Sequence, residues 1–173
     1  MSKPFSRRPL TPGERALADA VFDSALRLDT IRILAAPPPL VRAFVPGRGF
    51  GREWIIWPAR TWLPDFSVGT LKARASFVHE LVHVWQAQQG VNLALAKLRA
   101  GDGVRAYAYT PDETCRWVSL NIEQQAMVVE HAYRLSEGAT APAAQAFYRS
   151  VAPFSCGLER ALGGPFAPDL RRA

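Results

Sequence analysis

Two histidines and a glutamate lie close together near the middle of the 173-residue chain, in the run His79-Glu80-Leu81-Val82-His83. Residues four apart on an α-helix are separated by about 400° of rotation, so both imidazoles would lie on one face, one turn apart. Two neutral imidazoles in that position can bind one tetrahedral cation such as Zn²⁺. Glu80 lies about 100° around the helix from His79, where its carboxylate can take a proton from a water on the open coordination position. This motif predicts a hydrolytic zinc site.

The third zinc ligand should come from elsewhere in the chain, because a site that keeps one position for water needs three protein ligands. No histidine follows shortly after His83, so a carboxylate is expected. The stretch from about Val118 to Glu137 contains no glycine or proline and predicts a second helix. Two of its glutamates are seven residues apart, on nearly one face but about 10 Å apart along the axis, so one binds and the other has a different role. The acidic residues of this helix are Glu123, Glu130 and Glu137.

Several stretches of the chain resemble known proteins. The run that begins at Ile122-Glu123 looks like the glutamate-x-x-alanine pattern with which gluzincins present their third ligand from a following helix. More specifically, most of the chain closely resembles the small bacterial "Vgr-related" proteins. The stretches that carry this resemblance are Arg8-Pro9-Leu10-Thr11-Pro12-Gly13-Glu14, His79 to Gln88, Tyr107-Ala108-Tyr109 and Ile122-Glu123-Gln124-Gln125-Ala126.

The resemblance implies an α+β, zincin-like fold in which the His79 helix packs against the second helix. It puts His79, His83 and Glu123 on Zn²⁺ and makes Glu80 the general base. The Vgr-related proteins look like stripped-down zinc peptidases, similar to the peptidase-like domains that accompany contractile injection systems, including type VI secretion. The implied function is therefore hydrolysis of a peptide or protein substrate. The alternatives are a non-catalytic zinc-binding accessory or adaptor protein of such a secretion system, or an injected peptidase toxin.

One position departs from the pattern. Peptidases with the glutamate-x-x-alanine pattern often continue with an aspartate that orients a ligand histidine, whereas this chain has Met127 there. The orienting group must then come from another residue, and Glu130, Asp112 and Asn121 are the candidates.

Peptide hydrolysis also needs a donor for the oxyanion that forms when water attacks the carbonyl. His131, Tyr107 and Tyr109 are the candidates, and we expect His131 and Tyr109 to act with Glu80. His131 is two turns beyond Glu123 and would line a cleft, although a lone histidine is as often a structural hydrogen-bonding group. The two tyrosines are expected on one side of a short strand, where packing is the alternative role.

The remaining elements must position this site. The capping box Thr11-Pro12-Gly13-Glu14 starts a first helix, three short strands build a small N-terminal antiparallel or mixed sheet, and residues 1–10 are expected to be a flexible tail. The strand from Glu53 to Pro58 is either a core strand or an edge that holds substrate by strand addition. Four of the five tryptophans are expected in the core or the cleft wall: Trp54, Trp57, Trp85 and Trp117. The expected elements are a helix at about Pro12 to Leu28, strands at Ile31 to Leu34, Phe44-Val45 and Glu53 to Pro58, and a metal helix at about Thr70 to Gln89.

Composition restricts the class of protein. An apolar fraction of 49% can bury one core, so residues 1–173 are expected to form a single domain. The net charge of +6 arises from basic residues scattered along the chain without a nucleic-acid motif, so no nucleic acid partner is expected. Cys115 and Cys156 are expected to be free thiols. Neither a signal peptide nor a membrane span is recognisable, so we expect a cytoplasmic chain without membrane insertion, with export by an injection system as an option.

Overall fold

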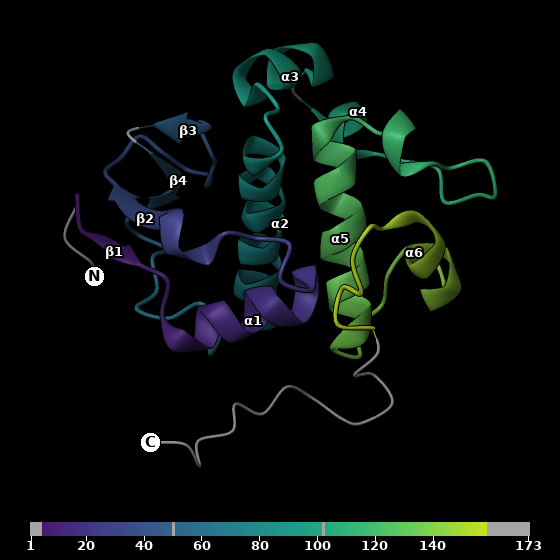
Figure 1. The fold of residues 1–173 in the computed structure, drawn as a ribbon, viewed down its shortest axis with the longest axis horizontal. Coiled ribbons are helices and arrows are strands. Elements are labelled where there is room, and N and C mark those ends of the chain that lie inside the picture. The colour runs from purple at the N-terminus through teal and green to yellow at the C-terminus, as the bar shows by residue number, and fades with distance from the viewer. Residues whose placement is uncertain (1–4, 50, 102, 159–173) are drawn as a thin grey trace.

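The structure, a computed structural model, describes residues 5–49, 51–101 and 103–158. Within these ranges the chain forms a small sheet and a set of α-helices (Figure 1). The elements in chain order are β1 (Arg7–Pro9), α1 (Pro12–Phe22), the 3₁₀ turn η1 (Leu28–Thr30), β2 (Ile31–Ala36), β3 (Arg48–Gly49), β4 (Arg52–Pro58), α2 (Leu71–Gln88), α3 (Leu93–Ala100), α4 (Val104–Tyr107), the 3₁₀ turn η2 (Trp117–Ser119), α5 (Ile122–Ser136) and α6 (Gln145–Val151).

The sheet is mixed, with strand order β1-β2-β4-β3. β2 and β4 are parallel at its centre, and β1 and β3 are antiparallel to their neighbours. The expectation of an α+β chain with a small N-terminal mixed sheet is therefore confirmed. The expectation of a flexible tail over residues 1–10 is wrong for its described part, because Arg7–Pro9 pair with β2.

The helices lie mainly to one side of the sheet (Figure 1). α2 packs against both β4 and α5, and α6 packs on the other side of α5. α1 crosses α2, while α3 and α4 lie near one end of the α2–α5 pair, at the top of the view. Among the described residues, none of these helices combines the length and the apolar character needed to cross a membrane.

Local sequence explains where the main helices begin. The Thr11 side chain accepts from the amide of Glu14, and the Glu14 carboxylate accepts from the amide of Thr11, which confirms the capping box. Thr70 caps α2, and Asn121 forms a second capping box at the start of α5. The first helix ends at Phe22 instead of continuing to Leu28, because Asp23 adopts a left-handed conformation with φ of 51°.

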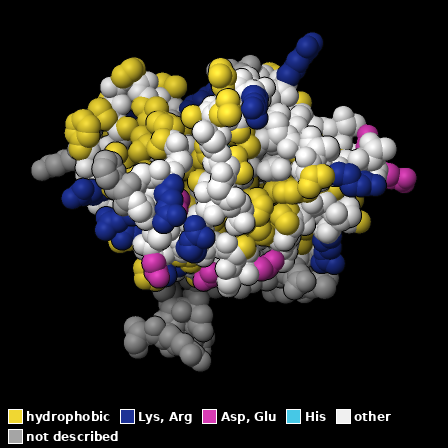
Figure 2. Space-filling view, turned by 45° about the horizontal axis from the view of Figure 1, so that its top comes forward, with side chains coloured by type: hydrophobic (Ala, Val, Ile, Leu, Met, Phe, Trp, Pro, Cys, Tyr) yellow, Lys and Arg dark blue, Asp and Glu magenta, His cyan; other side chains and the backbone are white. Residues whose placement is uncertain are grey.

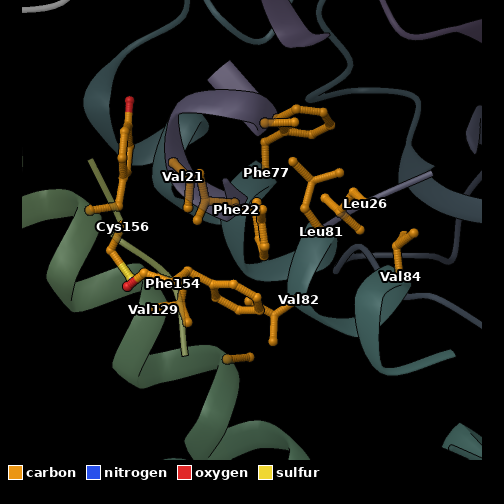
Figure 3. Packing of buried hydrophobic residues seen from close by; sticks show 14 of the residues in the cluster. Val21, Phe22, Leu26, Phe77, Leu81, Val82, Val84, Val129, Phe154 and Cys156 are labelled. Carbon is orange, nitrogen blue, oxygen red and sulfur yellow. The ribbon is translucent and has the colours of Figure 1, made fainter. Parts of the chain in front are cut away.

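The core lies where α1, α2 and the chain after α6 meet α5 (Figure 3). Phe22, Phe77, Leu81 and Val129 are fully buried, and the ring of Phe22 lies 4.9 Å from that of Phe154. Burying each such side chain contributes about 1.5–3 kcal/mol relative to exposure, so this cluster holds α2 and α5 in a fixed relation. Cys115 and Cys156 are both free, as expected, and the structure shows that both are buried. Trp57 is buried in the core, Trp85 and Trp117 are half-buried against it, and Trp54 lies on the other face of the sheet.

Candidate metal centre

Three side chains point their donor atoms at one another between α2 and α5. The Nε2 atoms of His79 and His83 lie 3.3 and 3.4 Å from Oε2 of Glu123. One ligand atom from each residue lies within 4.8 Å of the other two, which is the geometry of a possible metal site. The two histidines come from one face of α2, and Glu123 comes from the first turn of α5. Of the three glutamates on the second helix, Glu123 is the one that joins the histidines.

The other ring nitrogen of each histidine is held by a hydrogen bond. His83 Nδ1 lies 2.8 Å from Oε1 of Gln86, whose amide nitrogen donates to the Ile122 carbonyl and to Oε1 of Gln125. Because the Gln86 amide nitrogen is the donor in both of those bonds, its oxygen is an acceptor and His83 Nδ1 must donate. A histidine that donates from Nδ1 can bind a metal ion through Nε2, the nitrogen that lies on the side of Glu123.

His79 is held in the same way by a carboxylate. Its Nδ1 lies 3.1 Å from Oε2 of Glu130, two turns beyond Glu123 on α5. Burial acts to lower the pKa of His79, but the hydrogen bonds with Glu123 and Glu130 raise it to about 9. Of the three residues expected to orient a ligand histidine, Glu130 is the one in place. The exposed carboxylate of Asp112 instead accepts hydrogen bonds within its own loop, and Asn121 caps α5.

Glu80 is the buried acid beside this group. Its Oε2 atom has no hydrogen-bond partner in the described part of the chain. Burial raises the pKa of Glu80, and the charges of His83 and His79 oppose the rise. A buried carboxylate oxygen without a partner is costly in a folded protein. It fits a site completed by a bound metal ion and its water, so the donor set and this oxygen together fit a metal centre.

Lys97 and Tyr107 close the other side of the centre. Lys97 Nζ donates to Oε1 of Glu123 at 2.5 Å and to the Tyr107 hydroxyl at 3.0 Å. Glu123 thus directs one oxygen to the histidines and the other to Lys97. Burial acts to raise the pKa of Glu123, but the hydrogen bonds from His79 and His83 hold it well below its usual range. Tyr107 belongs to helix α4, so the expectation that it lies on a short strand is wrong.

A hollow of about 350 Å³ lies directly over the centre. It reaches His79, Glu80 and His83 at its floor, and its walls are Ala43–Pro46, Leu93 and Ile122, with Lys97 and Tyr107. A second hollow of about 670 Å³ shares His79, Glu80 and Tyr107 with it and continues past Met127 and Glu130. The two hollows therefore meet at the centre and leave room for an extended ligand on both sides.

The chain segment at the cleft edge is not the one that the sequence suggested. β4 lies between β2 and β3, and Phe44 pairs with Ile56 through two backbone hydrogen bonds, so β4 is a core strand. Residues 43–46 take the position beside the hollow. The possibility that Glu53 to Pro58 receives substrate as an edge strand is therefore wrong, because residues 44–49 already cover that edge.

His131 and Tyr109 form a separate cluster. The Tyr109 hydroxyl lies 2.8 Å from Nδ1 of His131 and 3.1 Å from the Tyr148 hydroxyl. Burial and the hydrogen bond with Tyr148 raise the pKa of Tyr109, and burial lowers that of His131. Neither residue lines the hollow over the metal centre. These contacts favour a structural role for both residues, whereas Tyr107 lies in the hollow.

Sequence reasoning missed Gln86 and Lys97. Gln86 is three residues beyond His83 on the same helix, so this spacing could have indicated a contact. Lys97 comes from α3, and no spacing along the chain connects it to Glu123.

Two comparisons with known proteins found similarity to the same type VI secretion spike protein. The sequence matches no family profile. It is 30% identical to the type VI secretion system spike protein VgrG2b of Pseudomonas aeruginosa. The matched region covers 70% of this chain but only 12% of the much longer VgrG2b. The structure is similar to that of the effector domain of Pseudomonas aeruginosa VgrG2b, with a TM-score of 0.63 and 29% identity over 83% of this chain and 80% of that domain. The chain is thus homologous to the effector domain of a type VI secretion spike protein.

Proposed function

We propose that this chain is a type VI secretion effector that hydrolyses peptide bonds with the aid of a zinc ion. The homology to the VgrG2b effector domain supports the first part. One observation carries the second: Glu80 places a buried, unpartnered carboxylate oxygen beside the His79, His83 and Glu123 ligand group, at the floor of a cleft. A structural ion pair would not need that vacant acceptor.

The ligand group suits zinc. Two imidazole nitrogens and one carboxylate oxygen are the ligand set of many catalytic zinc sites, which leave a fourth position for water. His79, His83 and Glu123 would hold the ion, with Glu130 and Gln86 fixing the two rings. A zinc ion bound there supplies Lewis acidity, which makes water a better nucleophile and polarises the scissile carbonyl.

Glu80 is the proton carrier in the proposed reaction. Its carboxylate accepts a proton from the attacking water as the new C–O bond forms, and then delivers that proton to the amide nitrogen as the C–N bond breaks. Burial raises the pKa of Glu80, which makes its carboxylate a stronger base toward the attacking water. The products are a free carboxyl group and an amine, so water is the only co-reactant.

Tyr107 is the proposed hydrogen-bond donor to the oxyanion. Its hydroxyl oxygen accepts a hydrogen bond from Lys97, so its own hydrogen is available to donate into the hollow. A preorganised donor at this position contributes about 2.7–4 kcal/mol to transition-state stabilisation. Lys97 holds Tyr107 and Glu123 together and therefore acts as a positioning residue.

Residues 43–46 are the proposed support for the peptide backbone. Phe44 directs its amide and carbonyl to Ile56, so the neighbouring residues Ala43 and Val45 direct theirs to the opposite side of the strand. Because these residues line the hollow, an extended substrate can pair with them and cross the metal centre.

The deciding experiment compares the wild-type chain with Glu80→Gln and with His79→Ala/His83→Ala. We expect near-stoichiometric zinc and cleavage of an unfolded protein such as reduced casein by the wild type. Glu80→Gln should keep its zinc and lose about 100-fold or more of the rate, because the general base is removed. The double histidine variant should lose both. Zinc retention with no cleavage by the wild-type chain would favour a non-catalytic accessory protein instead.

The effector role needs a cellular test of its own. The chain is produced inside a susceptible bacterium, either in the cytoplasm or directed to the periplasm, and growth is followed. We expect growth inhibition in at least one compartment, and we expect Glu80→Gln to abolish it at an equal protein level. Equal inhibition by both proteins would contradict an effector that acts by hydrolysis.

A further inference from the structure

Within the described residues, no helix lies over the outer face of the sheet, and this face bears an apolar groove. Side chains alternate along each strand, so residues next to Ile33 and Ile55, which are fully buried, point to the opposite face. A groove of about 560 Å³ runs across this face. Its apolar wall consists of Phe5, Leu34, Trp54 and Ile56.

Basic side chains surround the groove. Arg7 and Arg48 line it, and Arg32 and Arg52 point from β2 and β4 to the same face. The outward positions of the four strands carry no aspartate or glutamate in the part of the chain that the structure describes. Figure 2 shows hydrophobic side chains gathered over the strands with lysine and arginine side chains beside them.

The segments of the chain that contain the first three strands are rich in basic residues. Residues 1–13 and 30–52, which contain β1, β2 and β3, hold seven lysines and arginines and no acidic residue. All other positions together hold 14 basic and 15 acidic residues, a net charge of −1. Of these residues, Arg7, Arg32 and Arg52 point to the outer face, and Arg48 lines the groove with its Nε 3.7 Å from Oε1 of Glu53. Arg8 instead pairs with the buried Glu14 on the inner side.

We propose that this outer face, the basic sheet face, is a docking surface for an acidic segment of a partner protein that inserts apolar side chains into the groove. Charge complementarity identifies the partner as acidic, because concentrated positive charge steers an oppositely charged surface and selects against a basic one. The apolar centre with a charged rim is the pattern of a protein interface. A concave groove with a mainly apolar wall suits protruding apolar side chains better than a flat membrane surface or the polar edges of nucleic acid bases. The face lies on the side of the sheet away from helix α2 and its histidines, and Pro46 borders both the groove and the hollow over the metal centre.

The test uses the full chain and a short synthetic peptide in which glutamates alternate with leucines. We expect micromolar binding at low salt, and we expect the amide NMR signals of β1, β2 and β4 to shift. Arg7→Glu/Arg52→Glu should weaken binding by about tenfold or more, whereas Arg99→Glu/Arg105→Glu, which changes the charge equally on α3 and α4, should weaken it by less than about threefold. Trp54→Thr should weaken it as well, with zinc content and thermal midpoint unchanged.

Altered peptides and other ligands test which kind of partner binds the groove. A peptide with serine in place of leucine should bind at least about tenfold more weakly, and one with lysine in place of glutamate should not bind at about 1 mM. Equal binding of the serine peptide, an equal effect of the two arginine pairs, or no binding of the glutamate-leucine peptide would overturn the proposal. Tighter binding to single-stranded DNA or to phosphatidylserine vesicles than to the peptide would also overturn it in favour of those partners.

Discussion

The Oε2 atom of Glu130 lies 3.1 Å from Nδ1 of His79, while Nε2 of the same ring faces Glu123. Two glutamates of one helix thus contact opposite nitrogens of one imidazole. Their spacing of seven residues puts them two turns apart on one face of α5, so their carboxylates approach the ring from opposite ends. Glu130 therefore supplies the orienting carboxylate that Met127 does not.

Removing this orienting carboxylate should weaken zinc binding. We expect Glu130→Ala to lower the zinc affinity by about 10–100-fold, because the ring of His79 loses both its orientation and the charge that makes it a better ligand. A competition titration against a chelator of known affinity measures the change. Asp112→Asn is the control, since Asp112 bonds only within its own loop, and its affinity should stay within about twofold of wild type. An unchanged affinity in a folded Glu130→Ala protein would exclude this role.

Zinc binding should also depend on pH. In the metal-free protein the pKa of His79 is raised to about 9, so zinc must displace a proton from that ring at lower pH. The apparent zinc affinity should rise by about tenfold per pH unit from pH 7 and level off above pH 9. Glu130→Gln should move the plateau to lower pH, because one group that raises the pKa is lost. A flat profile between pH 7 and 9 would show that His79 is neutral in the metal-free protein.

The raised pKa of His79 also makes the stability of the metal-free protein depend on pH, but here the stability falls as the pH rises. The pKa of His79 is higher in the folded state than the ordinary value of 6.5. Its contribution to the free energy of unfolding is therefore fully present below pH 6.5 and disappears as the pH rises through about 9. Urea unfolding of zinc-free protein should show this loss, and saturating zinc should reverse the trend.

The local parts of this site are predictable from the sequence. Helix α2, the position of its two histidines, and the capping box at Thr11 all depend on residues within a few positions of one another. The choice of Glu123 over Glu130 rested on resemblance, because spacing alone left both on the same face. The structure shows that both contact His79, through different ring nitrogens.

Contacts between distant elements were beyond sequence reasoning. Lys97 reaches Glu123 only because α3 packs against α5, and the pairing of Phe44 with Ile56 removes β4 from the sheet edge. The charge of the sheet face was also hidden, because Arg7 and Arg52 are far apart in sequence and share one face of the sheet only through strand pairing. Each of these features depends on tertiary packing, which local patterns do not encode.

Two tyrosines two residues apart should behave differently when each loses its hydroxyl. Tyr107→Phe should lower kcat by about 100-fold with zinc content and unfolding free energy little changed, because the oxyanion loses a donor. Tyr109→Phe should leave kcat within a few fold but lower the unfolding free energy by about 1 kcal/mol, because His131 and Tyr148 lose a partner. Activity assays and urea unfolding separate the two effects. The reverse pattern would restore Tyr109 and His131 as the catalytic pair.

The N-terminal strand should depend on one buried carboxylate. Glu14 is fully buried, accepts two hydrogen bonds from Arg8 at 2.6 Å, and also accepts from the amides of Thr11 and Phe66. Glu14→Ala should lower the free energy of unfolding by about 3–5 kcal/mol, because the partly buried guanidinium of Arg8 and two amides lose their acceptor. Asp29→Ala is the control: it also removes an arginine partner, but its side chain is 90% exposed, so the loss should stay below about 1 kcal/mol. Equal effects of the two substitutions in urea unfolding would mean that burial of Glu14 adds nothing to its pairing with Arg8.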